Sequence, residues 1–193
     1  FDSGGGAGNF FTCNDGFRLL IKPPTGDLLG TAVETIAPTF AEVDHEWAGA
    51  DRGPNKVGFL NNTALGTLLL TPGDFEAQFP PLFLFAGTGI NNGLYVDVLD
   101  LSQLLDYQNE LQIEPNLVIY YAAAKLNFTP PLTNGVAQLP EEYLNGQFDG
   151  RLQWVKDFAG PKSSVAVVSN GVSIMVNKAL RNSKIIDSDG DGV

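Results

Sequence analysis

The sequence is poor in cysteine, histidine and methionine, with one of each among its 193 residues. Because Cys13 is the only cysteine, no disulfide can form within the chain. We expect its thiol to be buried in the core, with pairing to another chain or binding of a ligand as the alternatives. Zinc sites normally recruit several His or Cys ligands, and Cys13 and His45 provide one of each. The composition therefore argues strongly against a catalytic zinc.

Long apolar runs and positive charge are also scarce. No apolar stretch approaches the roughly 20 residues that a membrane span needs, so we expect no membrane insertion. Charged residues make up 17% of the chain, and 11 Lys and Arg stand against 22 Asp and Glu, which gives a net charge of −11. Such a surface repels phosphate backbones and attracts divalent cations. Nucleic acid is thus an unfavourable partner.

The chain is rich in apolar and turn-forming residues, with 44% hydrophobic residues, 22 Gly and 12 Pro. This composition predicts a folded, turn-rich β protein. Short β-type runs separated by turn residues cover 17–22, 57–60, 64–71, 81–86, 94–101, 117–126, 152–156, 165–169 and 172–176. We therefore predict an all-β fold, an antiparallel β-sandwich of the jelly-roll or immunoglobulin-like type, with one or two short helices.

Particular segments sharpen this prediction. In 94–99, Leu94, Val96 and Val98 alternate with Tyr95, Asp97 and Leu99, which predicts a half-buried antiparallel strand. The stretch 117–124 is apolar on both faces, so we place it centrally in a sheet. Asn170-Gly171 predicts a hairpin turn, and 102–109 and 140–144 predict short helices. No regular period is visible, which argues against a propeller or solenoid.

Three segments follow from these patterns. Residues 1–9 are Gly-rich and are predicted to be a flexible N-terminal segment, 10–184 form the β-sandwich domain, and 185–193 form an acidic, calcium-repeat-like tail. The chain begins with Phe rather than Met, which we interpret as the removal of a signal peptide.

The acidic tail carries the most specific motif of the sequence. Asp187, Asp189 and Asp191 alternate with Ser and Gly, so a tight loop can direct three carboxylates at one hard cation. This stretch resembles the D-x-D-x-D-G core of thrombospondin type 3 and dockerin-like calcium repeats. The resemblance implies Ca²⁺ as a cofactor and an extracellular setting. A complete coordination shell requires water, a neighbouring chain or further sequence.

Two further resemblances concern the second half of the chain. The stretches NLVIYYA, LNGQFDGRLQWV and FAGPKSS, followed by the calcium repeat, resemble a C-terminal block of large secreted bacterial surface proteins. The strand around Tyr95 and Asp97 resembles one in carbohydrate-binding β-sandwich modules. We take Tyr95, Asp97, Trp47 and Trp154 as candidate ligand-binding residues, because exposed aromatic rings stack on sugars, although such residues more often fill cores.

Catalytic patterns are weak. His45 lies beside Asp44, Glu46 and Trp47, but no nucleophile motif accompanies it, and a surface loop is the simpler interpretation. A pair of carboxylates could serve a glycosidase, and the sequence singles none out. We therefore predict no catalytic residues and no enzyme activity, with a polysaccharide-acting enzyme as the least favoured alternative.

Together these observations predict an extracellular or cell-surface protein. The leading hypothesis is a structural or assembly module of a bacterial surface, such as a filament or sheath subunit, whose copies associate with one another or with other surface proteins through β-strand contacts. The alternative is a carbohydrate-binding module with polysaccharide as its partner.

Overall fold

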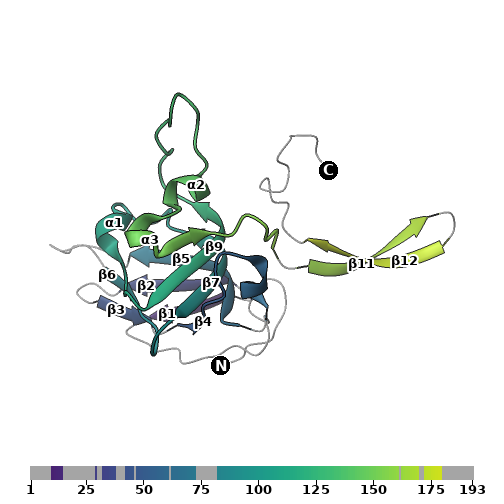
Figure 1. Cartoon of the computed structure of the whole chain (residues 1–193), viewed down its shortest axis with the longest axis horizontal. Coiled ribbons are helices and arrows are strands. Elements are labelled where there is room, and N and C mark those ends of the chain that lie inside the picture. Colours follow the sequence, from purple (N-terminus) through teal and green to yellow (C-terminus); the bar gives the residue numbers. More distant parts are fainter. Residues whose placement is uncertain are drawn as a thin grey trace.

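Two parallel β-sheets make up most of the molecule (Figure 1). The computed structural model describes residues 10–14, 29, 32–37, 42–45, 47–60, 62–72, 82–160, 162–169 and 172–179. The strands are β1 (Phe10–Asn14), β2 (Ala32–Ala37), β3 (Glu42–His45), β4 (Gly49–Ala50), β5 (Ala64–Pro72), β6 (Leu82–Phe85), β7 (Asn92–Asp100), β8 (Leu111–Ile113), β9 (Leu117–Lys125), β10 (Leu152–Trp154), β11 (Lys162–Ser169) and β12 (Val172–Ala179). The helices are η1 (Lys56–Phe59), α1 (Tyr107–Glu110), α2 (Pro140–Leu144) and α3 (Gln147–Gly150).

Sheet A is the seven-stranded sheet. Its strands follow the order β1-β2-β5-β7-β9-β10, and all neighbours on this path are parallel. The short strand β4 pairs antiparallel with the start of β7. Sheet B has the order β3-β6-β8 and is parallel throughout. The prediction of an antiparallel β-sandwich is therefore wrong, because the described strands form a mostly parallel, α/β-like arrangement with short helices beside it.

Parallel strands need long crossovers, which in most α/β proteins are helices. Here the crossovers between β2 and β9 pass through the other sheet: for example, the chain leaves β5 of sheet A, forms β6 of sheet B, and returns to sheet A as β7. The chain from β2 to β9 thus winds back and forth between the two sheets, and we call this winding part the coil. Ala32 pairs with Thr67, Leu65 with Val96 and Asn92 with Leu117, so the length of each turn differs. These unequal turns explain why the sequence shows no regular period.

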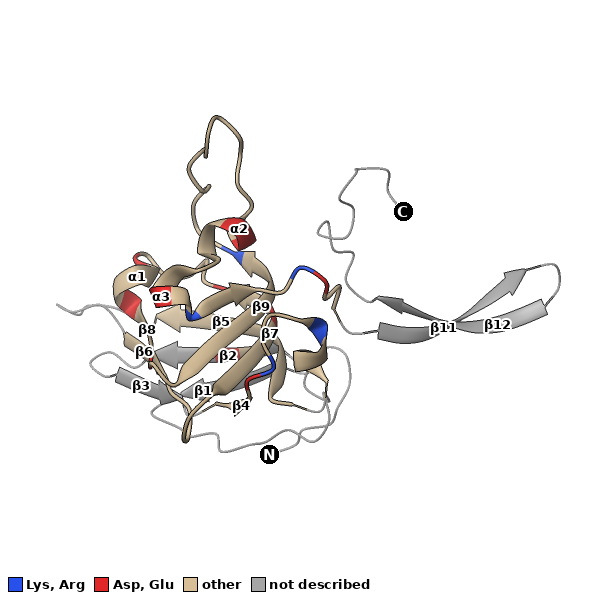
Figure 2. Ribbon diagram, viewed as in Figure 1, with Lys and Arg blue, Asp and Glu red and all other residues tan. Residues whose placement is uncertain are grey.

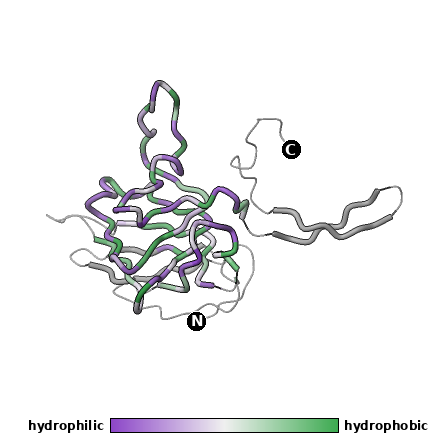
Figure 3. Tube along the Cα trace, in the orientation of Figure 1, coloured by the Kyte–Doolittle hydropathy of each residue, from purple (hydrophilic) through white to green (hydrophobic). Residues whose placement is uncertain are grey.

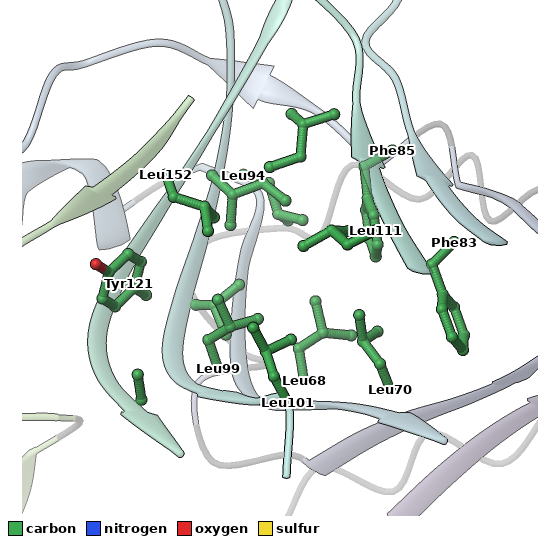
Figure 4. Close-up of a cluster of buried hydrophobic side chains, with 14 of the residues drawn as sticks. Leu68, Leu70, Phe83, Phe85, Leu94, Leu99, Leu101, Leu111, Tyr121 and Leu152 are labelled. Carbon is green, nitrogen blue, oxygen red and sulfur yellow. The ribbon is translucent and has the colours of Figure 1, made fainter. Parts of the chain in front are cut away.

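The main core lies between the two sheets (Figure 4). Parallel pairing in register stacks equivalent side chains into columns that run across sheet A. One column contains Leu65, Val96, Tyr121 and Trp154, and a second contains Val33, Leu68, Leu99 and Ala124. Phe83 and Phe85 of β6 and Leu111 and Ile113 of β8 belong to the same core from sheet B. Stacked apolar columns therefore join successive turns of the coil.

The residues of β7 that face the main core do not alternate regularly along the strand. Val96 and Leu99 both belong to the main core although they are three residues apart, and strand pairing is interrupted between them at Asp97. In a regular strand, residues three apart lie on opposite faces. The simple alternation expected over 94–99 therefore fails at Asp97, where the strand changes the face that it presents to the core.

The opposite face of sheet A carries a second, smaller core. Ala64, Tyr95 and Tyr120 form a column there, and Phe59 of η1 and Phe158 pack against it. The Phe59 and Phe158 rings stack with centroids 3.7 Å apart. The central strands are thus covered on both faces, as is typical of parallel sheets.

Several local predictions can be compared with the structure. Residues 117–125 form the strand β9, residues 140–144 form α2, and β11 pairs antiparallel with β12, so these elements are confirmed. The central placement of 117–124 is wrong, because β9 is the last strand but one of sheet A. The strand predicted over 57–60 is wrong, because η1 occupies it. The helix predicted from Ser102 begins only at Tyr107, since the Ser102 hydroxyl donates to Asp100 Oδ1 at 2.6 Å instead of capping a helix. Residues 1–9, 17–22 and 185–193 lie outside the described residues.

Candidate functional site

The edge of sheet A beside β10 is closed by side chains. β9 pairs with β10 over only three residues, so within the described chain the second half of β9 has no neighbouring strand on that side. There the backbone N–H of Ala124 donates to Glu141 Oε1 at 3.0 Å, and the Trp154 indole Nε1 donates to the Ala122 carbonyl at 3.1 Å. These bonds satisfy backbone groups that would otherwise attract another strand. We call this arrangement of β10, α2, Glu141 and Trp154 the cap.

Helix α2 positions the cap. Pro140 occupies its first turn, where a missing N–H costs nothing, and Glu141 and Glu142 follow in the favourable field of the helix N-terminus (Figure 2). Glu142 Oε2 accepts the backbone N–H of Leu139 at 3.2 Å. Glu141 turns inward and is only 9% exposed. Glu142 thus caps the start of the helix, whereas Glu141 bonds to the edge of β9.

Tyr121 joins α2 to the core of the coil. Its hydroxyl donates to the Glu141 carbonyl at 2.8 Å, and its ring is fully buried in the main core. Burial raises the pKa of Tyr121 well above its ordinary value, and the negative charge of Glu141 adds to this effect. The phenol therefore remains a protonated donor, which keeps α2 in place against β9.

A loop of residues 126–139 projects from the coil between β9 and α2 (Figures 1 and 3). Within this loop, Thr133 and Val136 exchange backbone hydrogen bonds of 2.9 and 3.0 Å. Asn134 and Gly135 between them have φ values of 54° and 80°, as a two-residue hairpin turn of type I′ requires. This turn positions Val136 beside the cap, with 67% of its surface exposed.

A pocket of about 370 Å³ lies where the 126–139 loop, α2 and β10 meet. Its lining contributes a hydroxyl, two amides, one charge of each sign and apolar groups, from Thr133, Gln138, Asn145, Glu142, Lys156, Val136, Ala137 and Trp154. The Lys156 ammonium lies 4.7 Å from the centre of the Trp154 ring, within the range of a cation–π contact. The pocket is therefore polar, carries no net charge from these residues, and has an aromatic component.

Two contacts hold the pocket residues in place. Asn145 Oδ1 accepts the backbone N–H of Trp154 at 2.9 Å, which connects the end of α2 to β10. Trp154 is 8% exposed, since most of its indole belongs to the main core. The pocket is therefore attached to the rigid cap on one side and to the projecting loop on the other.

The four candidate ligand-binding residues occupy different places. Trp154 lines the pocket, whereas Trp47 is buried in the main core with its ring edge-on to Phe85 at 6.0 Å. Asp97 is buried at the level where β7 changes faces. Tyr95 is fully buried, so its ring is no surface for stacking. The structure therefore brings only Trp154, of these four residues, to the pocket.

Tyr95 and Tyr120 stabilise the loop that follows β4. The Tyr95 hydroxyl accepts the backbone N–H of Arg52 at 2.8 Å and donates to the Gly53 carbonyl at 3.0 Å. The two rings stack with centroids 4.7 Å apart, and the Tyr120 hydroxyl donates to Asp51 Oδ1 at 2.6 Å. Burial raises the pKa of Tyr95 to about 12 and that of Tyr120 further. Both hydroxyls therefore remain donors across the neutral range.

The predicted calcium ligands Asp187, Asp189 and Asp191 lie outside the described residues, so their ligation stays a prediction. Among the residues that the structure describes, no three His, Cys, Asp or Glu side chains gather as a metal site would require. Cys13 lies in β1, and His45 is the last residue of β3. In the same described ranges, no helix is long and apolar enough to cross a bilayer.

The sequence did not single out Glu141, Gln138, Asn145 or Lys156. The only local signal was the acidic pair after Pro140, which predicted the first turn of a helix and nothing about a strand edge. Their roles depend on β9, α2 and β10 meeting in space. Comparison with protein-family models, with curated proteins and with solved structures finds no match to this chain.

Proposed function

We propose that the chain is a non-catalytic, extracellular structural and assembly module of a bacterial surface, and that it associates by β-strand addition at β1. The observation that supports this is the difference between the two ends of sheet A. The cap satisfies the edge of β9, whereas β1 pairs only with β2 within the described residues. Strands at an exposed sheet edge readily pair with another chain.

The same difference restricts how copies combine. End-to-end stacking would place β1 of one copy against the edge of β9 in another, where the cap interferes. Two copies can instead join β1 to β1 about a two-fold axis, which makes a closed pair with a continuous sheet. Other surface proteins can bind at β1 by donating a strand. A filament would require a further contact besides β1.

Calcium belongs to the same proposal. Asp187, Asp189 and Asp191 would contribute three carboxylate ligands, with water or a neighbouring chain completing the shell. Ca²⁺ would then orient the module on the surface.

Sedimentation velocity across a range of protein concentrations, with calcium and with a chelator, tests the assembly. Adjacent residues of a strand direct their N–H groups to opposite sides, so Phe11→Pro and Thr12→Pro remove one donor on each side of β1. We expect dimers of the unmodified chain. Of the two variants, the one that replaces the residue whose N–H points away from β2 should be a folded monomer. The other variant disturbs the β1–β2 pairing and serves as the matched control.

Circular dichroism of both variants distinguishes lost assembly from lost folding. A chain that stays monomeric at every concentration, with and without calcium, would contradict the proposal. Dimers that persist unchanged in both proline variants would show that association uses another surface.

A further inference from the structure

The pocket at the cap has hydrogen-bonding groups that the protein itself does not use. Within the described residues, the Gln138 side chain makes no hydrogen bond. Asn145 uses its Oδ1 atom toward Trp154, and Glu142 uses Oε2 toward Leu139, so the second polar atom of each remains available. The pocket therefore offers amide donors together with amide and carboxylate acceptors. Hydroxyl groups, which both donate and accept, complement such a mixture.

The charge of the pocket selects among ligands. Glu142 and Lys156 contribute one charge of each sign, so the lining has no excess of either. The whole chain carries a net charge of −11, which repels anionic polymers at long range. A neutral ligand rich in hydroxyl groups is thus favoured over an acidic one.

The size of the pocket and its apolar groups also favour a neutral ligand rich in hydroxyl groups. A volume of about 370 Å³ is near the lower end of the range for small-molecule sites. Val136, Ala137 and the small exposed part of Trp154 provide apolar contacts for the C–H groups of a sugar. Lys156, an exposed and flexible side chain, lies over the Trp154 ring and can move aside when a ligand enters.

We propose that this pocket binds a neutral saccharide, with Gln138 and Asn145 bonding its hydroxyls, Glu142 accepting from them, and Trp154 and Val136 contacting its apolar face. The inference goes beyond the assembly function and does not depend on it. Strand addition uses β1, whereas the pocket lies at the opposite end of sheet A.

Nuclear magnetic resonance of the full chain tests the proposal, because its two tryptophans give two indole N–H signals. Trp154 lies at the pocket and Trp47 is in the core, so Trp47 is an internal control. The probes are neutral hexasaccharides of glucose, mannose, galactose, xylose and N-acetylglucosamine, with hexagalacturonate as the acidic comparison. We expect at least one neutral probe to shift the Trp154 signal saturably and to leave that of Trp47 in place.

Two variants provide the matched comparison. Gln138→Ala removes a pocket amide and should weaken binding by about tenfold, whereas Gln103→Ala, at an exposed position outside the pocket lining, should leave it unchanged. The proposal is overturned if no neutral probe shifts the Trp154 signal, if only hexagalacturonate does so, or if Gln138→Ala binds as tightly as the unmodified chain.

Discussion

The two ends of sheet A differ in how their edges are satisfied. At the β10 end, a carboxylate and an indole bond to the backbone of β9, and α2 covers the strand. At the β1 end, the described residues provide one partner, β2. Repeat-like coils need such a terminal cap to prevent further growth. Within the described residues, side chains therefore satisfy the sheet edge at one end, whereas β1 has a single partner strand at the other.

Replacing Trp154 should have the largest effect at the cap. Trp154→Ala removes a buried indole from the main core and its bond to the Ala122 carbonyl. We expect a loss of about 4 kcal/mol in the free energy of unfolding, measured by urea titration. Trp154→Phe keeps most of the packing and removes the hydrogen bond, so it should cost about 1 kcal/mol. Equal losses for the two variants would show that the indole N–H, and not its packing, closes this end.

Opening the closed edge directly tests the contrast between the ends. Glu141→Ala leaves the buried N–H of Ala124 without its acceptor, which should cost about 2 kcal/mol. It should also add concentration-dependent association in sedimentation, because the edge of β9 becomes available. Glu141→Gln retains an acceptor oxygen and is the matched control, with a smaller loss and no new association. If Glu141→Ala behaves like Glu141→Gln, the carboxylate does not close the edge.

A substitution on the face of sheet A, away from both ends, should have the smallest effect. Tyr95→Phe removes the hydroxyl that bonds to Arg52 and Gly53, for a loss of about 1 kcal/mol at neutral pH. Burial raises the pKa of Tyr95 from 10.0 to about 12. Between these values the unfolded chain loses its proton while the folded chain keeps it, so stability should fall as pH rises from about 10 to about 12.

Chemical unfolding at a series of alkaline pH values measures this dependence. The Tyr95→Phe variant should show a shallower decline than the unmodified chain, because it lacks one such phenol. An identical decline in both proteins would assign the alkaline instability to other groups, among them Tyr120 and Tyr121, whose pKa values burial also raises.

The sequence predicted most of the strands but not their direction. Alternation along 94–99 is the same for parallel and antiparallel strands, so it could not distinguish a sandwich from a coil. The strongest available sign was the stretch 117–124, which is apolar on both faces and is typical of buried parallel strands. Because it was interpreted only as a central strand, its implication for strand direction was missed.

The candidate site, too, was predicted from the sequence only in part. Trp154 could be proposed from the sequence because aromatic residues often contact sugars, but Trp47 and Tyr95 satisfied the same criterion and are buried. No local pattern distinguishes an aromatic residue at a pocket from one in a core. Gln138 and Lys156 are ordinary surface residues in sequence terms, and only the meeting of a loop with β10 places them together.

By itself the sequence determined the local features: the Asn134-Gly135 turn, the start of α2 at Pro140, the hairpin of β11 and β12, and the acidic composition. Each depends on short-range sterics, on turn conformation or on summed charge. Tertiary structure alone decided that the strands from β5 to β9 alternate between two sheets and that Glu141 reaches the backbone of Ala124. The physical reason is that backbone pairing carries no side-chain code for direction, and that unequal turns bring together residues that are distant in the sequence.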